Sequence, residues 1–259
     1  MERKALAAAY RDQLRARVVP GADITRVGPL LRDDRGQILY RDLGGLEGDD
    51  VDALIAAQCA YFAGLGRAVE WKYHTDDLPK DLPDRLVRAG FTPGDDEQVM
   101  VGPSAAPSQV PVPPPGLRLR QVTSWDDLER IRRMEEAIWS TDHAWLPEAL
   151  HREITGTGDP CVVVVVEADG DIVCAGWVRF HPGTDFASLW GGSTLPAWRG
   201  KGLYRATVTD RMNRARAAGY SLVQVDTSPE SRPILERMGL CPIATTVPYT
   251  WTPPSAPTS

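Results

Sequence analysis

A short turn near residue 200 carries the residues best suited to chemistry. The segment LPAWRGKGLYR (195–205) places Lys201 between Gly200 and Gly202, immediately before a long run of helix-forming residues. The first turn of a helix has backbone N–H groups without partners inside the helix, and its dipole end is positive. Glycines before that turn let the backbone curl so that several N–H groups converge on one point. The natural ligand of such a turn is an anion, above all a phosphate or pyrophosphate.

Three cations surround the same turn and favour an anion site. Arg199, Lys201 and Arg205 would add positive charge beside the ligand. The segment lacks both the GxxxxGK(S/T) signature of nucleotide hydrolases and the features of a dinucleotide-binding repeat. A strand, a glycine turn and a helix also occur together as a plain connection, so the surrounding elements must decide.

Strand and helix patterns alternate after residue 116, which predicts an α/β domain with a mixed sheet. Ser124 is expected to be the N-cap of a helix with an acidic first turn. Gly191 and Gly192 interrupt a strand, as glycines do at a β-bulge or at a close backbone approach. The pattern predicts strands over 116–122, 160–168, 171–180, 184–195, 221–226 and 243–251, and helices over 124–139, 147–154, 202–218 and 230–239.

The first half of the chain repeats this plan in a weaker form. The segment PDRLVRAGF (83–91) resembles RPILERMGL (232–240), because in both a helix ends on a glycine before a short apolar segment. A duplicated fold is the natural explanation. The first-half helix follows GGLEGDD (44–50), which is acidic where the second half is basic. We therefore expect only the second half to bind a phosphate.

The basic turn also resembles a known motif. LPAWRGKGLYRATV (195–208) is similar to the acyl-CoA pyrophosphate motif of the Gcn5-related N-acetyltransferases (GNAT family), whose pattern is (Q/R)xxGx(G/A). Arg199 fills the first position and Gly202 the fourth, whereas Tyr204 stands where the family usually has glycine or alanine. The order of elements from 116 to 251 resembles that family as well.

The resemblance implies the acyl-CoA N-acyltransferase fold, a mixed and mostly antiparallel sheet flanked by helices, here in two tandem copies. We expect a degenerate acetyltransferase-like domain at 1–105 and a proline-rich linker at 106–116. An acetyl-CoA-binding acetyltransferase domain would follow at 117–252, and a disordered tail at 253–259. In this family the fourth strand bulges and diverges from the fifth, and the acyl-CoA lies in the opening between them.

Carried over residue by residue, the resemblance implies a site for acetyl-CoA as cosubstrate. Gly192, Ser193 and Thr194 would meet the pantetheine arm. The remaining cofactor-binding residues would be Arg199, Gly200, Lys201, Gly202, Leu203, Tyr204 and Arg205 around the pyrophosphate, with Ser228 in place of an asparagine that often begins the closing-helix motif.

The implied reaction is direct transfer of an acetyl group to a primary amine, which is expected to belong to a small molecule. The tyrosine that often serves as the acid is replaced by Leu235. Tyr249 is our candidate acid, with Tyr204 as an alternative, because either phenol could protonate the leaving thiolate. The candidate bases are Asp142 and His143, with His181 and Asp226 as alternatives.

The aromatic residues and the missing tyrosine leave two questions open. Trp139, Trp145, Trp177 and Trp190 could be core residues, but two or more of them in the cleft would favour an aromatic or aliphatic amine. A non-catalytic acyl-CoA-binding or sensor protein remains the alternative to an enzyme.

Composition limits the remaining classes of function. A formal net charge of −6 over 259 residues argues against a nucleic-acid partner, which needs a concentrated basic face. The sequence contains no apolar run of membrane-spanning length, and its N-terminus does not resemble a signal peptide, so we expect a cytoplasmic monomer or homodimer. The four cysteines show no metal-binding spacing, so no metal site is expected.

Overall fold

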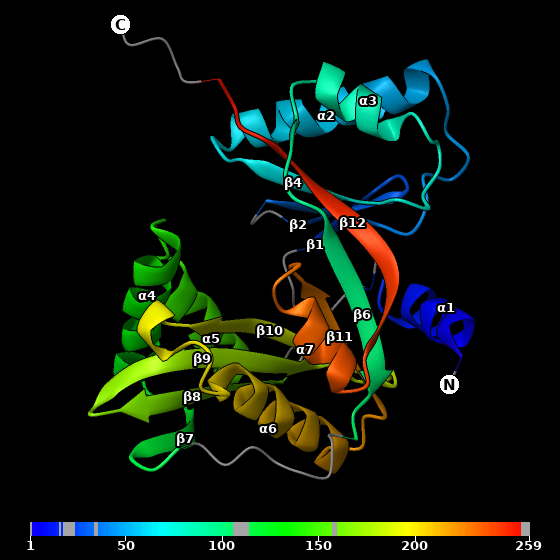
Figure 1. The fold of residues 1–259 in the computed structure, drawn as a ribbon. Helices are drawn as coiled ribbons and strands as arrows, with labels where there is room; N and C mark the ends of the chain where they lie inside the picture. The colour runs from blue at the N-terminus through cyan, green and yellow to red at the C-terminus, as the bar shows by residue number, and fades with distance from the viewer. Residues whose placement is uncertain are drawn as a thin grey trace, which may run out of the picture. The chain divides into compact units, whose positions relative to one another are not determined.

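The computed structural model describes residues 2–15, 17, 24–33, 36–105, 114–156 and 160–254 (Figure 1). The chain forms two compact units: the first contains Met1–Val99 and Pro242–Ser259, and the second contains Met100–Cys241. Within the described ranges, no helix is long and apolar enough to cross a membrane. No group of acidic, histidine or cysteine side chains in those ranges could hold a metal ion.

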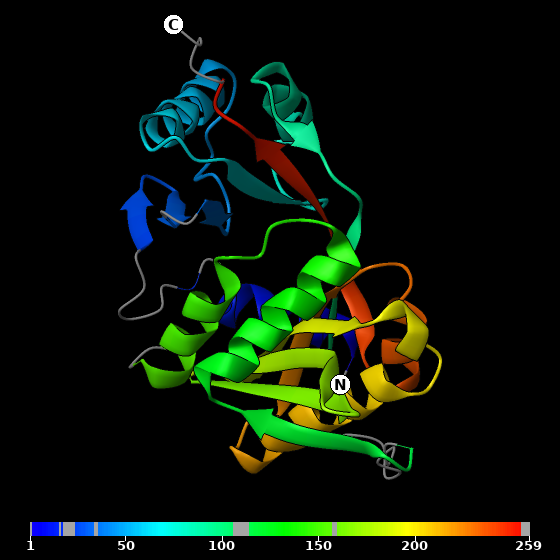
Figure 2. The ribbon, with the colours of Figure 1, turned by 90° about the vertical axis from the view of Figure 1, so that its left-hand side faces the viewer.

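The second unit is a mixed sheet between two layers of helices (Figure 2). Its strands follow the order β6-β11-β10-β9-β8-β7. The pairs β7/β8, β8/β9 and β9/β10 are antiparallel, whereas β10/β11 is parallel. The elements are β6 (Glu97–Pro103), β7 (Leu117–Val122), α4 (Trp125–Trp139), α5 (Leu146–Thr155), β8 (Cys161–Ala168), β9 (Asp171–Phe180), β10 (Phe186–Thr194), the 3-10 turn η1 (Pro196–Trp198), α6 (Leu203–Ala217), β11 (Leu222–Thr227) and α7 (Arg232–Arg237).

Apolar spacing explains how the helices of this unit are placed. Helix α4 buries Leu128, Ile131 and Met134, which recur every three residues and so share one face. This face packs with α5 and with inward-facing residues of β8 and β9. Helices α6 and α7 cover the opposite face of the sheet, where Met212 and Leu235 are fully buried. The Ser124 cap is present, because its Oγ accepts a hydrogen bond from the Asp127 backbone N–H at 3.2 Å.

The first unit follows the same plan, which confirms the predicted duplication of the fold. Its strands follow the order β1-β2-β3-β4-β12-β6. Strands β3 and β4 are parallel and joined through α2, just as β10 and β11 are joined through α6. Its elements are α1 (Arg3–Gln13), β1 (Ile24–Val27), β2 (Leu30–Asp33), β3 (Gln37–Tyr40), α2 (Asp49–Gly64), β4 (Val69–His74), α3 (Leu82–Arg88), β5 (Thr92–Pro93) and β12 (Cys241–Trp251).

The last strand divides the chain differently from the expected boundary. We expected 243–251 to complete the second domain, but β12 pairs antiparallel with β4 from Thr246 to Trp251. The units therefore separate at 99/100 and at 241/242, not at 105/106. A proline-rich linker reveals a connection in the chain, whereas backbone pairing between residues 170 positions apart leaves no local signal in the sequence. Most of that linker (106–113) and of the tail (255–259) lies outside the described residues.

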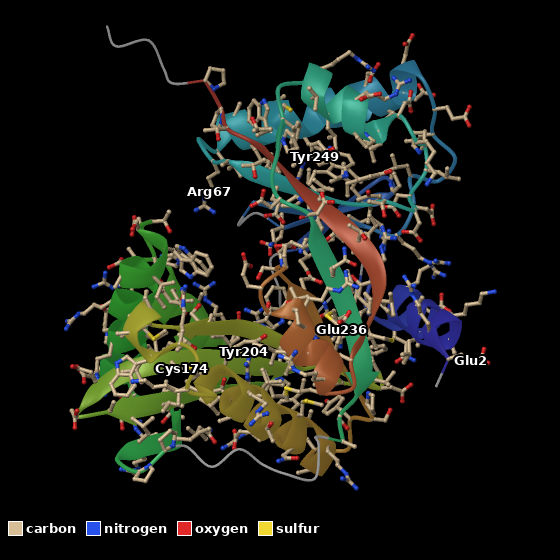
Figure 3. All side chains as sticks on the ribbon, viewed as in Figure 1. Glu2, Arg67, Cys174, Tyr204, Glu236 and Tyr249 are labelled. Carbon is tan, nitrogen blue, oxygen red and sulfur yellow. The ribbon has the colours of Figure 1, made fainter. Side chains whose placement is uncertain are left out.

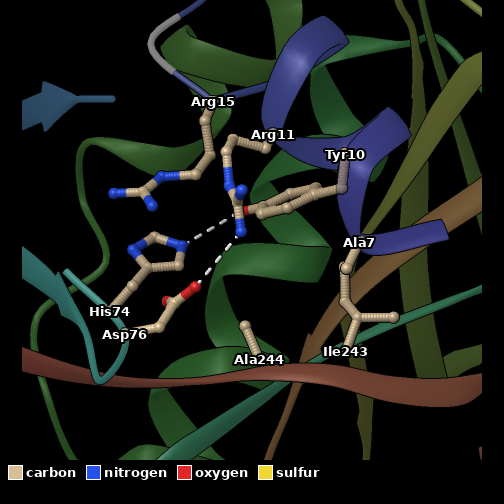
Figure 4. A pocket seen from close by; sticks show the side chains of 8 residues that line it. All are labelled: Ala7, Tyr10, Arg11, Arg15, His74, Asp76, Ile243 and Ala244. Carbon is tan, nitrogen blue, oxygen red and sulfur yellow. Dashed lines mark hydrogen bonds and ion pairs between the residues drawn. The ribbon is translucent and has the colours of Figure 1, made fainter. Parts of the chain in front are cut away.

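A small hollow in the first unit is too small to be a substrate site. Its volume is ≈ 20 Å³, room for about one water molecule, and it lies among α1, the end of β4 and β12 (Figure 4). Beside it, the Tyr10 hydroxyl and the His74 Nε2 form a hydrogen bond of 3.2 Å. The Arg15 guanidinium forms a buried, bidentate ion pair with Asp77 at 2.7 and 2.8 Å. These contacts hold α1 against β4 and indicate a structural role for this cluster.

We predict that Tyr249→Ala destabilises the first unit by about 3 kcal/mol, because truncating a buried aromatic leaves a cavity. Tyr249 is 8% exposed and packs in the core of the first unit, edge-on to the Tyr73 ring at 6.4 Å. Urea denaturation measures the change. A loss below about 1 kcal/mol would show that β12 contributes little to that core.

Candidate active site

The basic turn has the backbone geometry of an anion site. Gly200 and Gly202 have φ of 75° and 80°, in the left-handed region that favours glycine. Gly202 is the N-cap of α6, and no side chain caps this helix. The first backbone bond of α6 runs from the Ala206 N–H to the Gly202 carbonyl at 2.9 Å. The N–H groups of 203–205 precede that bond and are thus available to a ligand.

The cations at the turn are held by weak local contacts. The Lys201 ammonium lies 4.2 Å from the centre of the Trp198 ring, and the Arg199 Nε donates to the Thr194 carbonyl at 3.2 Å. Lys201 and Trp198 line a hollow of ≈ 290 Å³, and Arg199 follows Trp198 in the chain. Leu117, Ala168 and Trp198 give this hollow an apolar wall, which suits a flat ring beside the anion.

Strands β10 and β11 diverge before they reach the turn. Their parallel pairing covers only Phe186–Ser188 against Leu222–Gln224, although β10 continues to Thr194 and β11 to Thr227. The edge of 189–194 that faces β11 consequently lacks a strand partner within the described part of the chain. Backbone donors and acceptors without partners are costly when buried, so this edge is ready to pair with an extended ligand.

The predicted bulge is present in β10. The register with β9 shifts between Gly191 and Ser193, and Gly191 and Gly192 have φ of 65° and 86°. A Cβ on Gly191 would lie 2.4 Å from the Trp177 ring, and one on Gly192 would lie 2.8 Å from the Tyr204 ring. Because Tyr204 is in the first turn of α6, the bulge and the start of the anion-binding helix are in contact.

Arg211 of α6 binds backbone carbonyls on both strands next to the bulge. Its side chain is 1% exposed, and its Nη1 donates to the carbonyls of Trp190 at 2.9 Å and Trp177 at 3.3 Å. Desolvation lowers its pKa, and it makes no ion pair with any carboxylate that the structure describes. A peptide's C=O and N–H point in opposite directions, so fixing the Trp190 carbonyl also fixes the direction of the Gly191 N–H.

A buried carboxylate lies beside the bulge, and the sequence reasoning missed it. Glu135 of α4 is 4% exposed, and its Oε2 accepts hydrogen bonds from the Ser193 hydroxyl and the Trp139 Nε1, both at 2.8 Å. Burial raises the pKa of Glu135. Glu135 precedes Glu136 in the charged run RRMEE (132–136), a pattern typical of a solvent-exposed helix face. The signal that could have identified it is its helical spacing from the apolar residues Leu128 and Ile131, which puts it on the buried face of α4.

Of the residues expected to be catalytic, His143 lies near this carboxylate, and Asp142 precedes it in the same loop. His143 exerts an electrostatic effect on Glu135, and its ring stacks against Trp145 with centroids 6.3 Å apart. Asp142 accepts a hydrogen bond from the Ala144 N–H at 2.8 Å and is exposed, so it shapes the loop between α4 and α5. Of the alternatives, the His181 ring contacts the Ser188 Oγ at 2.7 Å, and Asp226 accepts from Gln224.

Tyr249, the expected acid, lies in a different unit from the basic turn and the bulge. It belongs to the core of the first unit, whereas the turn and the bulge belong to the second (Figure 3). We chose it on the assumption that the last strand completes the second sheet, but that strand pairs with β4. Leu235 is fully buried against α6 and is apolar, so it cannot replace the acid.

Tyr204 is the tyrosine that the structure brings next to the bulge. Its ring lies against Gly192. Burial raises the pKa of this phenol, which keeps it protonated and able to donate, and Ser231, before the start of α7, lowers that pKa by a smaller amount. Ser228 lies in the same loop, where its carbonyl accepts the Arg232 N–H at 3.2 Å and its Oγ lies 3.3 Å from the Ser231 Oγ.

We predict that Gly191→Ala destabilises the second unit by about 2 kcal/mol more than Gly183→Ala does. Both glycines have positive φ, so both changes carry the same backbone strain, but a Cβ at Gly183 meets open space. Only the bulge position forces a side chain into the Trp177 ring, and overpacking of this kind costs about 1–3 kcal/mol. Chemical denaturation of the two variants measures the difference. Equal stabilities would mean that the bulge can relax freely.

Comparisons with known proteins were made for the sequence and the fold. Residues 125–240 match the acetyltransferase (GNAT) family. No curated protein matches the sequence. The fold is similar to that of a GCN5-related N-acetyltransferase from Kribbella flavida, with 17% identity, a TM-score of 0.65 and coverage of 97% of this chain and 95% of that chain.

Two further structures share the fold over most of the chain. A tandem GNAT protein from the clavulanic acid biosynthesis pathway has 15% identity, a TM-score of 0.60 and coverage of 98% of this chain and 97% of that chain. A GCN5-related N-acetyltransferase from Sphaerobacter thermophilus has 18% identity, a TM-score of 0.58 and coverage of 88% and 76%. At these identities the likeness concerns the fold alone. The matched stretch of the second unit belongs to the acetyltransferase (GNAT) family, and the chain as a whole has the two-copy fold of a tandem GNAT protein.

Proposed function

We propose that the second unit transfers an acetyl group from acetyl-CoA to the primary amine of a small molecule. One observation carries this proposal: the ring of Tyr204, in the first turn of α6, contacts Gly192 of the β10 bulge. An anion-binding turn and an unpaired, bulged strand edge are therefore parts of one site. An acyl-CoA is a molecule that needs both features, because its pyrophosphate is an anion and its pantetheine arm is extended and amide-bearing.

In this proposal, different segments of the second unit bind different parts of acetyl-CoA. The N–H groups of 203–205 and the side chains of Arg199, Lys201 and Arg205 would hold the pyrophosphate. The backbone of Gly192, Ser193 and Thr194 would pair with the pantetheine arm as an added strand. Together these contacts would bring the thioester to the bulge, where the Gly191 N–H is held in a fixed direction through the Trp190–Arg211 bond.

The reaction that this arrangement supports is attack of a neutral amine on the thioester carbonyl. The amine nitrogen bonds to the carbonyl carbon, and the C–S bond then breaks to release the thiolate. A backbone N–H at the bulge would stabilise the negative oxygen that forms in between. Tyr204 would protonate the thiolate, and the closeness of its ring to Gly192 of the bulge supports this role.

The first unit has lost the features of the anion site, so we expect one acetyl-CoA per chain. Its helix α2 also begins after a left-handed glycine, Gly48, but Asp49, Asp50 and Asp52 occupy its first turn. Arg85 of α3 donates to the Gly48 carbonyl at 2.9 Å and to Asp52 at 2.7 Å. A carboxylate-lined turn that is already bound to an arginine repels a phosphate.

We predict that Gly202→Asp abolishes acetyl-CoA binding, because it adds a negative charge and a side chain at the helix start. Gly219→Asp is the matched control, since it lies just beyond the other end of α6, also has positive φ, and also faces open space. Calorimetry should show one bound equivalent for the wild type and for the control. Unchanged affinity in the Gly202 variant would refute the assignment of the turn.

We further predict that Tyr204→Phe lowers turnover by about tenfold to a hundredfold, toward the lower end of what a positioned acid contributes. Acetyl-CoA affinity should change little. Tyr249→Phe is the matched control and should keep full turnover. Release of free thiol from acetyl-CoA in the presence of amines measures both. If acetyl-CoA binds but no amine releases thiol, the chain is an acyl-CoA-binding or sensor protein.

A further inference from the structure

One carboxylate oxygen of Glu135, Oε1, is buried and accepts no hydrogen bond from the residues that the structure describes. Both hydrogen bonds to this buried carboxylate reach Oε2, from Ser193 and Trp139. A buried acceptor without a partner is costly, and a buried charge without a counter-ion is costlier still. The arrangement is therefore incomplete without a donor that carries positive charge.

Helix α4 carries arginines, but those with described ion pairs bind carboxylates other than Glu135. Arg132 binds both oxygens of Glu136 at 2.7 Å, and Arg130 binds Asp127 and Glu167. The titratable groups with an electrostatic effect on Glu135 or affected by it are His143 and the Cys174 thiol of β9. None of these supplies an ion pair to Glu135 within the described ranges, which leaves Oε1 open to a donor on a ligand.

Three partly exposed tryptophans occur here, one in contact with Glu135, one in the loop after α4 and one next to the bulge. Trp139, which bonds to its Oε2, is 59% exposed, and Trp190, just before the bulge, is 38% exposed. Trp145 is 62% exposed and stacks against His143. Exposed tryptophans are unusual on a soluble surface, and their rings attract both apolar groups and cations.

From these contacts we propose that Glu135 binds the ammonium group of the acetyl acceptor, and that this acceptor is a primary amine on an apolar, alkyl or arylalkyl, body. The inference rests on the proposed acetyltransferase function and specifies the substrate of that site. The ammonium donates to Oε1, and the indole faces of Trp139 and Trp190 cover the apolar body. Oε1 is buried, so the proposal requires the partly exposed Trp139 indole to shift enough to admit the amine while still lying against its apolar body.

The same carboxylate is placed to take the proton that the ammonium must lose. Glu135 accepts a hydrogen bond from Ser193, the residue at the end of the bulge. An amine at Oε1 would therefore lie close to the proposed position of the thioester. One N–H proton passes to Oε1, the freed electron pair bonds to the carbonyl carbon, and the sulfur leaves with the C–S electrons. The nitrogen then releases a second proton to water, and the thiolate takes a proton from Tyr204 or from water, so the products are the neutral amide and the CoA thiol. Burial raises the pKa of Glu135, which makes it a better proton acceptor.

The first experiment compares amines as acceptors with acetyl-CoA. Phenethylamine and hexylamine should show kcat/KM at least about tenfold above ethanolamine and glycine, because only the former can bury an apolar body. Equal or reversed preference would overturn the proposed substrate class. If acetyl-CoA itself fails to bind in calorimetry, the proposed function fails instead, so the two failures are distinguishable.

The second experiment compares Glu135→Gln with Glu136→Gln, its neighbour on the same helix. Glu135→Gln should lower kcat with phenethylamine about a hundredfold and remove the loss of activity toward acidic pH, while acetyl-CoA affinity stays the same. It should also abolish phenethylamine binding to the CoA complex in calorimetry. Glu136→Gln should change none of these quantities.

A fold control completes the test. Because burial raises the pKa of Glu135, its charged form costs stability above its ordinary pKa, and that cost disappears as the pH falls. Glu135→Gln should therefore melt no lower than the wild type at pH 8. A variant that keeps phenethylamine binding and the wild-type pH profile would overturn the proposal. A lower Tm at pH 8 together with lost activity would also overturn it, in favour of a structural role for Glu135.

Discussion

The candidate site depends on strand β10, which pairs with β9 on one side but separates from β11 on the other. It pairs with β9 along its whole length through a bulge, but with β11 for only three residues. The two neighbours diverge, and the backbone edge between them is left without a partner. Arg211 makes this tolerable, because a buried guanidinium satisfies the carbonyls of Trp177 and Trp190 where the ladder is disturbed. That arginine belongs to α6, so the helix that begins at the basic turn also supports the bulge.

The two units show what a duplicated fold can lose while keeping its architecture. Both retain a parallel strand pair joined by a helix that begins after a left-handed glycine. In the second unit the first turn of that helix follows Arg199 and Lys201. In the first unit it contains three aspartates, of which Asp52 is bound by Arg85. In the proposed function, this change of charge at one turn separates the copy that binds acetyl-CoA from the copy that does not, because the sheet does not depend on those side chains.

Much of the second unit followed from local pattern. The alternation of strands and helices, the cap at Ser124 and the glycine bulge were predicted, since each depends on residues close in sequence. The anion-binding geometry of Gly200 and Gly202 was predictable for the same reason. The choice of Tyr249 as the acid was wrong in its premise, because membership of a sheet depends on which distant strand provides hydrogen bonds. Glu135 went unnoticed because a carboxylate inside an alternating run of charges looks solvated until the packing of α4 buries it.

The sequence by itself determined the turn, its charge and the duplicated order of elements, because glycine conformations, helix dipoles and side-chain periodicity act over a few residues. Only the tertiary structure decided that β12 pairs with β4, that Tyr204 touches the bulge, and that Glu135 shares a hydrogen bond with Ser193. Each of these is a contact between residues 12 to 182 positions apart, where burial and backbone pairing are set by the whole fold. Catalytic chemistry depends on such contacts, so the residues proposed to bind the cosubstrate could be inferred from the sequence more readily than those proposed to move protons.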